Sequence, residues 1–330
     1  MPSIFDAHQP GVATPHFDHA ALAAFDVAAA DRRELAALLA VWTTQADRLM
    51  GAAHGALTVT VGLGGGLFDG RFGLADKRPA GLRPLPAFPG DALDPARCDG
   101  DVGVLVAGRD AAATEQAVAD LATAARLSAT TRWIQRGRLV RRPGDGARGA
   151  PRDVLGFRDG TNTLRRGRDL DRHVWVRGRE RSWMLGGTFL VLRRIHVDLE
   201  AWQRLSTAGQ EAVIGRQRES GAPLGPGGPY DAVPADTTAP ENAHVRVAAP
   251  KRNGGATMLR RSYSFDGGGE VGLLFLAFVA DPRRQYVPVQ RRLAHEDALA
   301  PYLTCLASAL FAVPPGARPG GFVAEPLLAA

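Results

Sequence analysis

The order of the elements predicted for the first half of the chain constrains its fold more than any other sequence feature. Apolar residues recur at helical spacing in two segments and alternate or cluster in four others. These patterns predict, in chain order, a strand over 21–27, a helix over 31–50, strands over 57–61 and 102–106, a helix over 111–127 and a strand over 130–135. The Gly- and Pro-rich stretch 71–99 is expected to be a long loop. The order is therefore β-α-β-β-α-β.

The second half repeats most of this order. Its patterns predict a strand over 188–197, a helix over 199–218, an irregular Gly- and Pro-rich excursion over 221–243, strands over 258–265 and 271–280, and a helix over 283–309. The almost wholly apolar run 271–280 is typical of a central strand. Two such units predict an α+β fold of two ferredoxin-like βαββαβ units in tandem, of the dimeric α+β barrel type, with antiparallel sheets and helices packed outside. We expect an N-terminal domain over 1–150 and a C-terminal domain over 151–330.

The segment between the two halves, 136–183, is rich in arginine and has no clear periodicity. Seven arginines lie between Arg165 and Arg181, and acidic residues are mixed among them. The pattern favours a solvated linker of mixed charge, although a loop of this length inside a compact chain is often functional.

Composition narrows the class of protein. The 330 residues carry a net charge of +6 and a pI near 10.0, and only two of the 40 basic residues are lysine. This excess suits acidic small molecules at least as well as nucleic acid, and no helix-turn-helix, zinc-finger or RNA-binding motif is present. Two cysteines, Cys98 and Cys305, exclude a disulfide scaffold and a four-cysteine zinc site, and two unpaired thiols are expected.

No targeting or membrane signal stands out. No run of 18 apolar residues predicts a membrane span. The opening MPSIFDAHQPGV lacks the basic region, the apolar region and the cleavage site of an export signal. We therefore expect either a cytoplasmic protein or the mature form of an exported one.

Three segments carry residues suited to chemistry, and the first is Gly156-Phe-Arg-Asp159-Gly160-Thr-Asn162. Glycines flank its acid, and glycine permits a tight turn and the close approach of another group. Alone, Asp-Gly is an ordinary turn. The segment lies in the irregular linker and not between hairpin strands, which favours a site that presents Asp159.

The second segment is Asn242-Ala-His244-Val-Arg246. Histidine is the side chain that most often binds metals, but a lone histidine is more often structural. The chain has no HExxH, CxxC or paired histidines, so a zinc site built from protein ligands has no support. A single protein ligand points instead to a cofactor that supplies the other ligands, as haem does.

The third segment is MLRRSYSF, residues 258–265, which precedes the apolar strand. Arginine inside an apolar strand is costly unless it is paired. By strand alternation Arg261 faces one way and Arg260 the other. At least one of them is expected to face a polar cavity, the alternative being a salt bridge to an acidic partner.

These blocks resemble the dye-decolourising peroxidase family. GFRDG matches the family's GxxDG motif, and AHVR, MLRRSYSF and GLLFLAFV resemble its later blocks in order and approximate spacing. The segments HQPGVATP and LTVTVGLGGGLFDGRFGL are similar to the bacterial A-type subgroup, whose members are often exported by the twin-arginine route. The resemblance runs from His8 to Pro315, nearly the whole chain.

The resemblance implies haem b in the C-terminal half and a role for each matched polar residue. His244 would be the proximal iron ligand. Asp159 would be the distal acid–base residue, and Arg260 the distal arginine. Asp297 would be the acidic partner of the His244 ring, with Glu296 as its competitor.

The resemblance also implies which residues surround the cofactor. Leu273 and Phe275 fall where the family has apolar residues of the distal pocket, and Asn162 closes the GFRDG segment beside the cofactor. Arg246, two residues after the ligand, would reach a haem propionate. Ser262 stands where some relatives carry an amide, which departs from the family pattern.

The function that the resemblance implies is a haem-dependent peroxidase, which reduces hydrogen peroxide through a ferryl intermediate and oxidises dyes, phenolics or similar donors. Asp159 would move the proton between the peroxide oxygens, and Arg260 would stabilise the developing charge. The alternative is a haem-handling protein with deferrochelatase-like release of iron from haem. A non-catalytic anion binder explains none of the matched blocks. Expected partners are hydrogen peroxide and aromatic or anionic small-molecule reductants, without nucleic acid or a membrane span, and with a homo-oligomer left open.

Overall fold

The first half of the chain folds in the predicted order. The computed structural model describes residues 1–141, 150–164, 167–178, 181–234 and 236–329. The first half contains β1 (His19–Val27), α1 (Arg32–Ala52), β2 (Leu57–Gly64), β3 (Val102–Gly108), α2 (Ala111–Ala125) and β4 (Ala129–Arg138). The loop between β2 and β3 contains the short 3₁₀ turns η1 (Gly65–Phe68), η2 (Ala75–Lys77), η3 (Ala80–Leu82) and η4 (Pro95–Arg97). The predictions for this half are confirmed, apart from shifts of a few residues at element ends.

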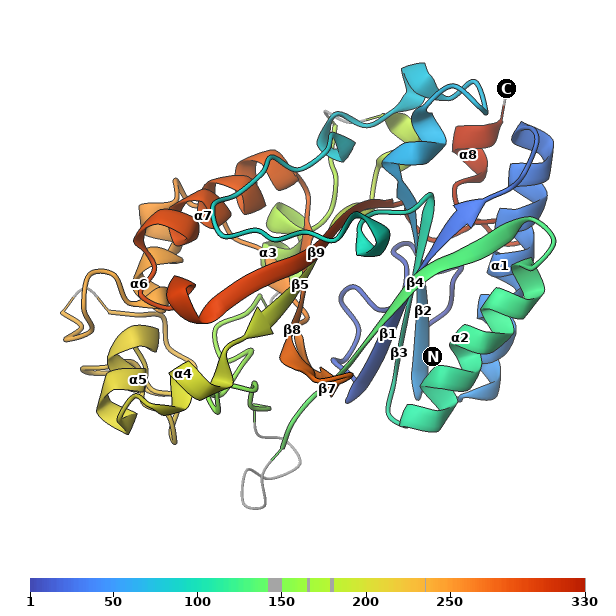
Figure 1. Cartoon of the computed structure of the whole chain (residues 1–330). Helices are drawn as coiled ribbons and strands as arrows, with labels where there is room; N and C mark the ends of the chain where they lie inside the picture. The colour runs from blue at the N-terminus through green and yellow to red at the C-terminus, as the bar shows by residue number, and fades with distance from the viewer. Residues whose placement is uncertain (142–149, 165–166, 179–180, 235, 330) are drawn as a thin grey trace.

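Local sequence explains the two long helices of this half. Asp31 and Asp110 cap them by accepting hydrogen bonds from the backbone N–H groups of Glu34 and Ala113. The predicted apolar stripe of α1, which includes Trp42, is buried, and so is the apolar face of α2. Both helices pack on the outer side of the strands β1 to β4 (Figure 1).

The second half has more and shorter elements. They are α3 (Gly167–His173), η5 (Ser182–Met184), β5 (Thr188–Val197), α4 (Leu199–Gln203), α5 (Thr207–Ile214), α6 (His244–Val247), η6 (Pro250–Arg252), β6 (Leu259–Arg260), β7 (Tyr263–Gly267), β8 (Glu270–Val279), α7 (Pro282–Glu296), η7 (Ala300–Tyr302), β9 (Leu303–Val313) and α8 (Glu325–Leu328). The excursion 221–243 is irregular, as predicted, at every position that the structure describes. The linker contains α3 and is therefore not wholly irregular.

The strands form one antiparallel sheet that closes on itself. Their order is β5-β9-β2-β3-β1-β4-β7-β8-β6, and β5 also pairs with β8. Both β6 and β7 pair with β8, one after the other along it. The halves meet where β2 pairs with β9 and where β4 pairs with β7. Each half has the same internal strand order, β2-β3-β1-β4 in the first and β7-β8-β5-β9 in the second.

A single helix over 283–309 is wrong. Helix α7 ends at Glu296, with Asp297 as its C-cap, and η7 then leads into β9. The run that forms β9 is rich in alanine and leucine, which favour a helix by intrinsic propensity. Pairing with β5 along the whole of that strand overrides this propensity and adds the strand that closes the ring.

Two more predicted elements are interrupted. The helix over 199–218 is wrong as a single helix, because α4 and α5 are separated by a turn and Gly215, at φ +88°, ends α5. The strand over 258–265 is divided into β6 and β7 by two residues that belong to neither. The prediction of a central strand over 271–280 is confirmed, since β8 pairs with β5 on one side and with β6 and β7 on the other.

The closed sheet has a filled interior and a divided outer face. Leu22, Leu105, Leu190 and Leu274 belong to one buried cluster inside the sheet, to which both halves contribute. Outside, α1 and α2 cover the first half and α7 with α6 covers the second (Figure 1). Both cysteines are free thiols. Within the described parts of the chain, no helix has the length and apolar character needed to cross a membrane.

Candidate active site

A cavity of about 870 Å³ lies between the outer face of the second-half sheet and the elements that cover it. The sheet contributes outward side chains such as Ile195 and Leu273, because alternate residues of β5 and β8 point away from the interior. Helices α6 and α7 contribute His244 and Leu293, and the segment 153–164 lines a further wall. A mostly apolar cavity with a few convergent polar groups is typical of a cofactor or ligand site.

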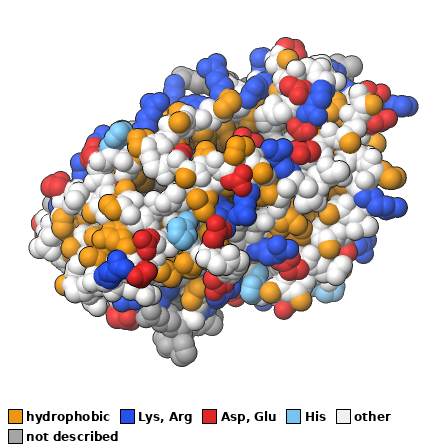
Figure 2. Space-filling view, viewed as in Figure 1, with side chains coloured by type: hydrophobic (Ala, Val, Ile, Leu, Met, Phe, Trp, Pro, Cys, Tyr) orange, Lys and Arg blue, Asp and Glu red, His pale blue; other side chains and the backbone are white. Residues whose placement is uncertain are grey.

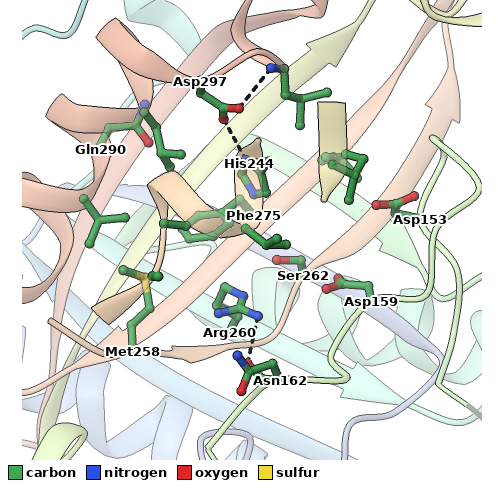
Figure 3. A pocket seen from close by; sticks show the side chains of 18 of the residues that line it. Asp153, Asp159, Asn162, His244, Met258, Arg260, Ser262, Phe275, Gln290 and Asp297 are labelled. Atoms are coloured by element: carbon green, nitrogen blue, oxygen red, sulfur yellow. Dashed lines mark hydrogen bonds and ion pairs between the residues drawn. The ribbon is translucent and has the colours of Figure 1, made fainter. Parts of the chain in front are cut away.

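His244 begins α6 and faces this cavity (Figure 3). Its Nδ1 lies 2.6 Å from Oδ2 of Asp297, whose side chain is 3% exposed. The second oxygen of Asp297 accepts a hydrogen bond from the Leu299 N–H. Burial opposes protonation of His244, but the Asp297 carboxylate outweighs it and raises the pKa of the imidazole above its usual value. One ring nitrogen is thus engaged, and Nε2 is left for a ligand.

Two charged residues near His244 point elsewhere. Glu296 pairs with Arg252 and Arg292, each at 2.7 Å, so Asp297 and not Glu296 is the partner of the imidazole. Arg246 forms an ion pair with Glu241 and is absent from the lining of the cavity. Two residues along a helix correspond to about 200° of rotation, which turns Arg246 away from the face of His244. The predicted contact of Arg246 with a haem propionate therefore has no geometric basis in this structure.

A tight turn presents Asp159 to the cavity. Gly156, at φ +90°, adopts a conformation that favours glycine, and its N–H donates to the Asp153 carbonyl at 3.0 Å. The Asp153 side chain accepts a hydrogen bond from the Phe157 N–H at 3.0 Å, which closes the turn. The Asp159 carboxylate then accepts the Gly160 N–H at 2.6 Å. The glycines of the motif thus serve the turn that the sequence predicted.

Arg260 reaches the cavity from the end of β6. Its Nη2 donates to the Asn162 carbonyl at 3.1 Å, which ties the guanidinium to the segment that carries Asp159. Ser262 lies beside these groups. Figure 3 shows Arg260, Ser262 and Asp159 across the cavity from His244. The structure therefore brings together an imidazole on one side and an acid with a guanidinium on the other.

The neighbouring strand residues follow the predicted alternation. Arg261 turns away from the cavity, and its guanidinium donates to carbonyls of Val12 and Thr14 in the N-terminal arm. Leu273 and Phe275 both line the cavity. Of the two arginines, Arg260 is thus the one that faces the cavity.

Two polar groups of the cavity, Asp153 and Arg216, were not predicted from the sequence. Asp153 lies on the same turn as Asp159, and burial, reinforced by the Asp159 charge, raises the pKa of Asp153 to about 7. Arg216 is 5% exposed and donates to the Gly221 carbonyl at 2.7 Å. A second acid six residues before Asp159 was a usable signal, whereas Arg216 enters the cavity only because α5 ends where it does.

Protein ligands alone do not assemble a metal site among the residues that the structure describes, since no three His, Cys, Asp or Glu side chains come together in a way that could hold an ion. A metal on His244 therefore needs further ligands from a cofactor. This agrees with the chemistry expected of a histidine that has one carboxylate partner and one free ring nitrogen.

Charged side chains are mixed on the surface. Figure 2 shows Lys and Arg interspersed with Asp and Glu on the face drawn. Several arginines pair with acids, as Arg136 does with Glu115 at 2.7 Å. Of the arginine-rich linker, Arg165, Arg166 and Arg179 lie outside the described residues.

The cavity brings a histidine with a carboxylate partner together with a second acid and a guanidinium, and family models identify the class of protein as an enzyme. The Dyp-type peroxidase N-terminal model matches residues 9–138, and the C-terminal model matches residues 150–318. The dye-decolorizing peroxidase of Thermobifida fusca is 37% identical over 98% of this chain and 84% of its own length. The deferrochelatase of Escherichia coli K12 is 30% identical over 95% of this chain and 84% of its own length.

Solved structures give the same result. An oxyferrous complex of DtpA from Streptomyces lividans matches with a TM-score of 0.92 and 39% identity, over 99% of this chain and 96% of that one. A DyP-type peroxidase from Streptomyces coelicolor matches with a TM-score of 0.91 and 40% identity, over the same shares of the two chains. The chain belongs to the Dyp-type peroxidase family.

Proposed function

We propose that this chain is a haem peroxidase that reduces hydrogen peroxide and oxidises dyes, phenolics or similar small donors. One observation carries the proposal: a single cavity has the His244–Asp297 pair on one side and Asp159 with Arg260 on the other (Figure 3). The peroxidase relatives, and the description of the DtpA structure as an oxyferrous complex, support an iron centre.

The cavity suits haem b in size and in chemistry. Its volume of about 870 Å³ falls in the usual range for cofactor sites. Leu273 and Phe275 offer apolar walls, Asn162 lies at the edge, and the buried Arg216, whose guanidinium donates to the carbonyls of Gly221, Pro229 and Asp231, adds a positive charge to the lining. Bound through His244, haem supplies a redox-active iron for the reduction of peroxide.

The His244–Asp297 pair orients and tunes the ligand. Since Nδ1 is directed at the carboxylate, the proton lies on that nitrogen and Nε2 carries the lone pair. The Asp297 carboxylate makes the imidazole a stronger electron donor, and its bond to the Leu299 N–H keeps it in place.

Asp159 and Arg260 handle the proton and the charge. Asp159 accepts the proton that peroxide loses and returns it to the leaving oxygen, directly or through one water. The Gly160 N–H at 2.6 Å keeps the carboxylate oriented. Arg260, anchored on the Asn162 carbonyl, presents a guanidinium to the negative charge that develops as the O–O bond breaks.

The test is to load the purified protein with haem and add one equivalent of hydrogen peroxide. We expect a stoichiometric complex whose visible spectrum changes promptly, and bleaching of dye in the steady state. Asp159→Ala and Arg260→Ala should each keep the haem and slow the reaction with peroxide by on the order of 10²–10³-fold. Protein that binds no stoichiometric haem, or whose haem ignores peroxide, contradicts the proposal.

The match to a deferrochelatase favours release of iron from haem as a second function. The two activities differ in their products. We expect incubation with haem, without peroxide, to leave the porphyrin iron-bound if the protein is a peroxidase only. Fluorescence of intact, iron-free porphyrin in that incubation supports the second function.

We also propose that the halves 1–150 and 151–330 are two ferredoxin-like units in tandem. The identical internal strand order of the two halves supports this, as do the separate family models that match each half. Expression of 1–150 alone tests it: a cooperative unfolding transition is expected, and an unfolded fragment contradicts independent units.

A further inference from the structure

Asp153 is a second acid in the cavity, and the proton transfer described above leaves it without a role. It lies on the turn that carries Asp159, and Figure 3 shows the two carboxylates on the same side of the cavity. Among the described residues, no Lys, Arg or His nitrogen forms an ion pair with it. A half-buried carboxylate in a mostly apolar cavity, without a cationic partner, is costly in its charged form, so its presence here needs a reason.

The contacts of Asp153 connect it to the position of Asp159. Its carboxylate accepts the Phe157 N–H at 3.0 Å, and its own backbone N–H donates to the Phe157 carbonyl at 2.9 Å. Together with the bend at Gly156, these bonds close the turn two residues before Asp159. Loss of the acceptor leaves a buried N–H without a partner and loosens the turn.

The surroundings of Asp153 favour its protonated form. Asp159 accepts a backbone N–H, and Arg260 lies on the same side of the cavity. Asp153 is half-buried within the cavity and faces the negative charge of Asp159, and the His244 side chain on α6 opposes this effect. The Arg218 guanidinium packs against the same turn at Gly156. Burial and the charge of Asp159 raise the pKa of Asp153 to about 7. Arg152 lies behind the turn and is occupied by the Gly156 carbonyl and by Glu219.

We propose that Asp153 is the positioning residue of Asp159: it holds the turn that aims Asp159, and its own carboxyl group carries a proton in mildly acidic solution. The proposal rests on the peroxidase function above. When the pH rises through the titration of Asp153, a second negative charge enters the cavity. That charge opposes the negative charge that develops on the peroxide oxygens, and the reaction slows.

Asp153→Asn removes the titratable proton of residue 153 but keeps its role as a hydrogen-bond acceptor. Asparagine keeps an oxygen for the Phe157 N–H but cannot titrate. Asp198→Asn is the matched control, because Asp198 also accepts a backbone N–H, from Ala201 at 2.9 Å, and does not line the cavity. Asp153→Ala removes the acceptor and the proton together.

The first readout is the infrared band of a protonated carboxyl group, measured in both haem-free and loaded protein. We expect wild type and Asp198→Asn to show a band that disappears as the pH rises through about 7, and Asp153→Asn to lack it. A band that survives in Asp153→Asn, or that is absent from the wild type in mildly acidic solution, overturns the proton assignment. This readout stands even if the protein has no reaction with peroxide, so the two proposals fail separately.

The second readout is the rate of peroxide consumption as a function of pH in the haem-loaded protein. We expect a decline through about 7 in the wild type and in Asp198→Asn, and no inflection there in Asp153→Asn. Asp153→Ala should lose up to about 10²-fold at every pH, since a small misplacement of a catalytic group can cost that much, and Asn should restore the rate. A wild-type pH profile in Asp153→Asn, or a wild-type rate in Asp153→Ala, overturns the positioning role.

Discussion

The two halves of the sheet share their strand order but use their outer faces differently. In the first half, helices of 21 and 15 residues cover the strands, and Trp42 is fully buried between them with its Nε1 donating to the Leu121 carbonyl at 3.0 Å. In the second half, α4, α5 and α6 have 5, 8 and 4 residues, and only α7 is long. A long amphipathic helix fills a sheet face, whereas short helices and loops leave room. The site lies where the same kind of sheet is covered less completely.

This comparison places tight packing in the first half of the chain and the chemistry in the second half. The variant expected to have the largest effect on haem binding is His244→Ala. We expect this variant to fold and to lose stoichiometric haem binding, because His244 lines the cavity and is the iron ligand that we propose. Haem titration followed by absorption measures the effect. The control is His295→Ala, an exposed histidine on α7, which should bind haem like the wild type. Equal binding by both variants contradicts the assignment of His244.

Trp42→Ala tests the packed half. Removing a fully buried tryptophan should lower the free energy of unfolding by roughly 3–5 kcal/mol, as measured by urea denaturation. The protein that remains folded should bind haem with unchanged stoichiometry, since α1 contributes nothing to the cavity. A loss of haem binding in the folded fraction shows that packing in the first half also determines the cavity in the second half.

The pH dependence of the unfolding free energy tests the contribution of Asp153 in the second half. Its pKa is about 7 in the folded protein, against 3.8 for an ordinary aspartate. The unfolded chain releases this proton first, so the stability that Asp153 contributes is present below the ordinary pKa and is lost as the pH rises through about 7. This difference between the folded and the ordinary pKa of Asp153 corresponds to about 4 kcal/mol of unfolding free energy. Unfolding of haem-free protein across this range should show the decline in wild type and a flatter profile in Asp153→Asn, and identical slopes contradict it.

Asp297→Ala addresses the partner of the ligand. Loss of a residue that orients a metal-binding histidine typically costs 10–100-fold in affinity or activity. We expect a weaker haem affinity within that range, measured by competition for haem with a protein of known affinity. Glu296→Ala should leave the affinity unchanged, because Glu296 pairs with Arg252 and Arg292 instead. An effect of Glu296→Ala equal to that of Asp297→Ala removes the special role of Asp297.

The smallest expected effect is at the helix cap of the packed half. Asp31→Ala removes the acceptor of the Glu34 N–H and should cost about 1 kcal/mol of unfolding free energy. The rate of peroxide consumption should not change, because α1 lies over the other half of the sheet. A change in that rate links the two faces and breaks the comparison.

The elements of the first half were predictable because their periodicity is strong and their ends carry local signals, such as the capping Asp31. The Ala- and Leu-rich run of β9 was not predictable, because the same residues suit a helix until β5 provides a partner. The break of the helix over 199–218 at Gly215 had a local cause, but the positive φ that ends α5 became visible only in the folded chain.

The site divides in the same way. Residue type and motif selected Asp159, His244 and Arg260 as candidates, and the structure brings all three to one cavity, while their roles stay a prediction. Arg246 pairs with Glu241 and is not among the residues that line the cavity, a direction set by the short helix α6 that the motif did not reveal. Asp153 acquires its unusual proton affinity only from burial beside Asp159.

The sequence by itself determined the fold class, the position of most elements and the residue types of the site, because these follow from local periodicity and side-chain chemistry. Tertiary structure alone decided which strands pair, which face of the sheet holds the cavity and which acids meet which cations. The bond from His244 to Asp297 joins residues 53 positions apart, and the bond from Arg260 to Asn162 joins residues 98 positions apart. Contacts over such separations depend on the packing of whole elements, which no local pattern specifies.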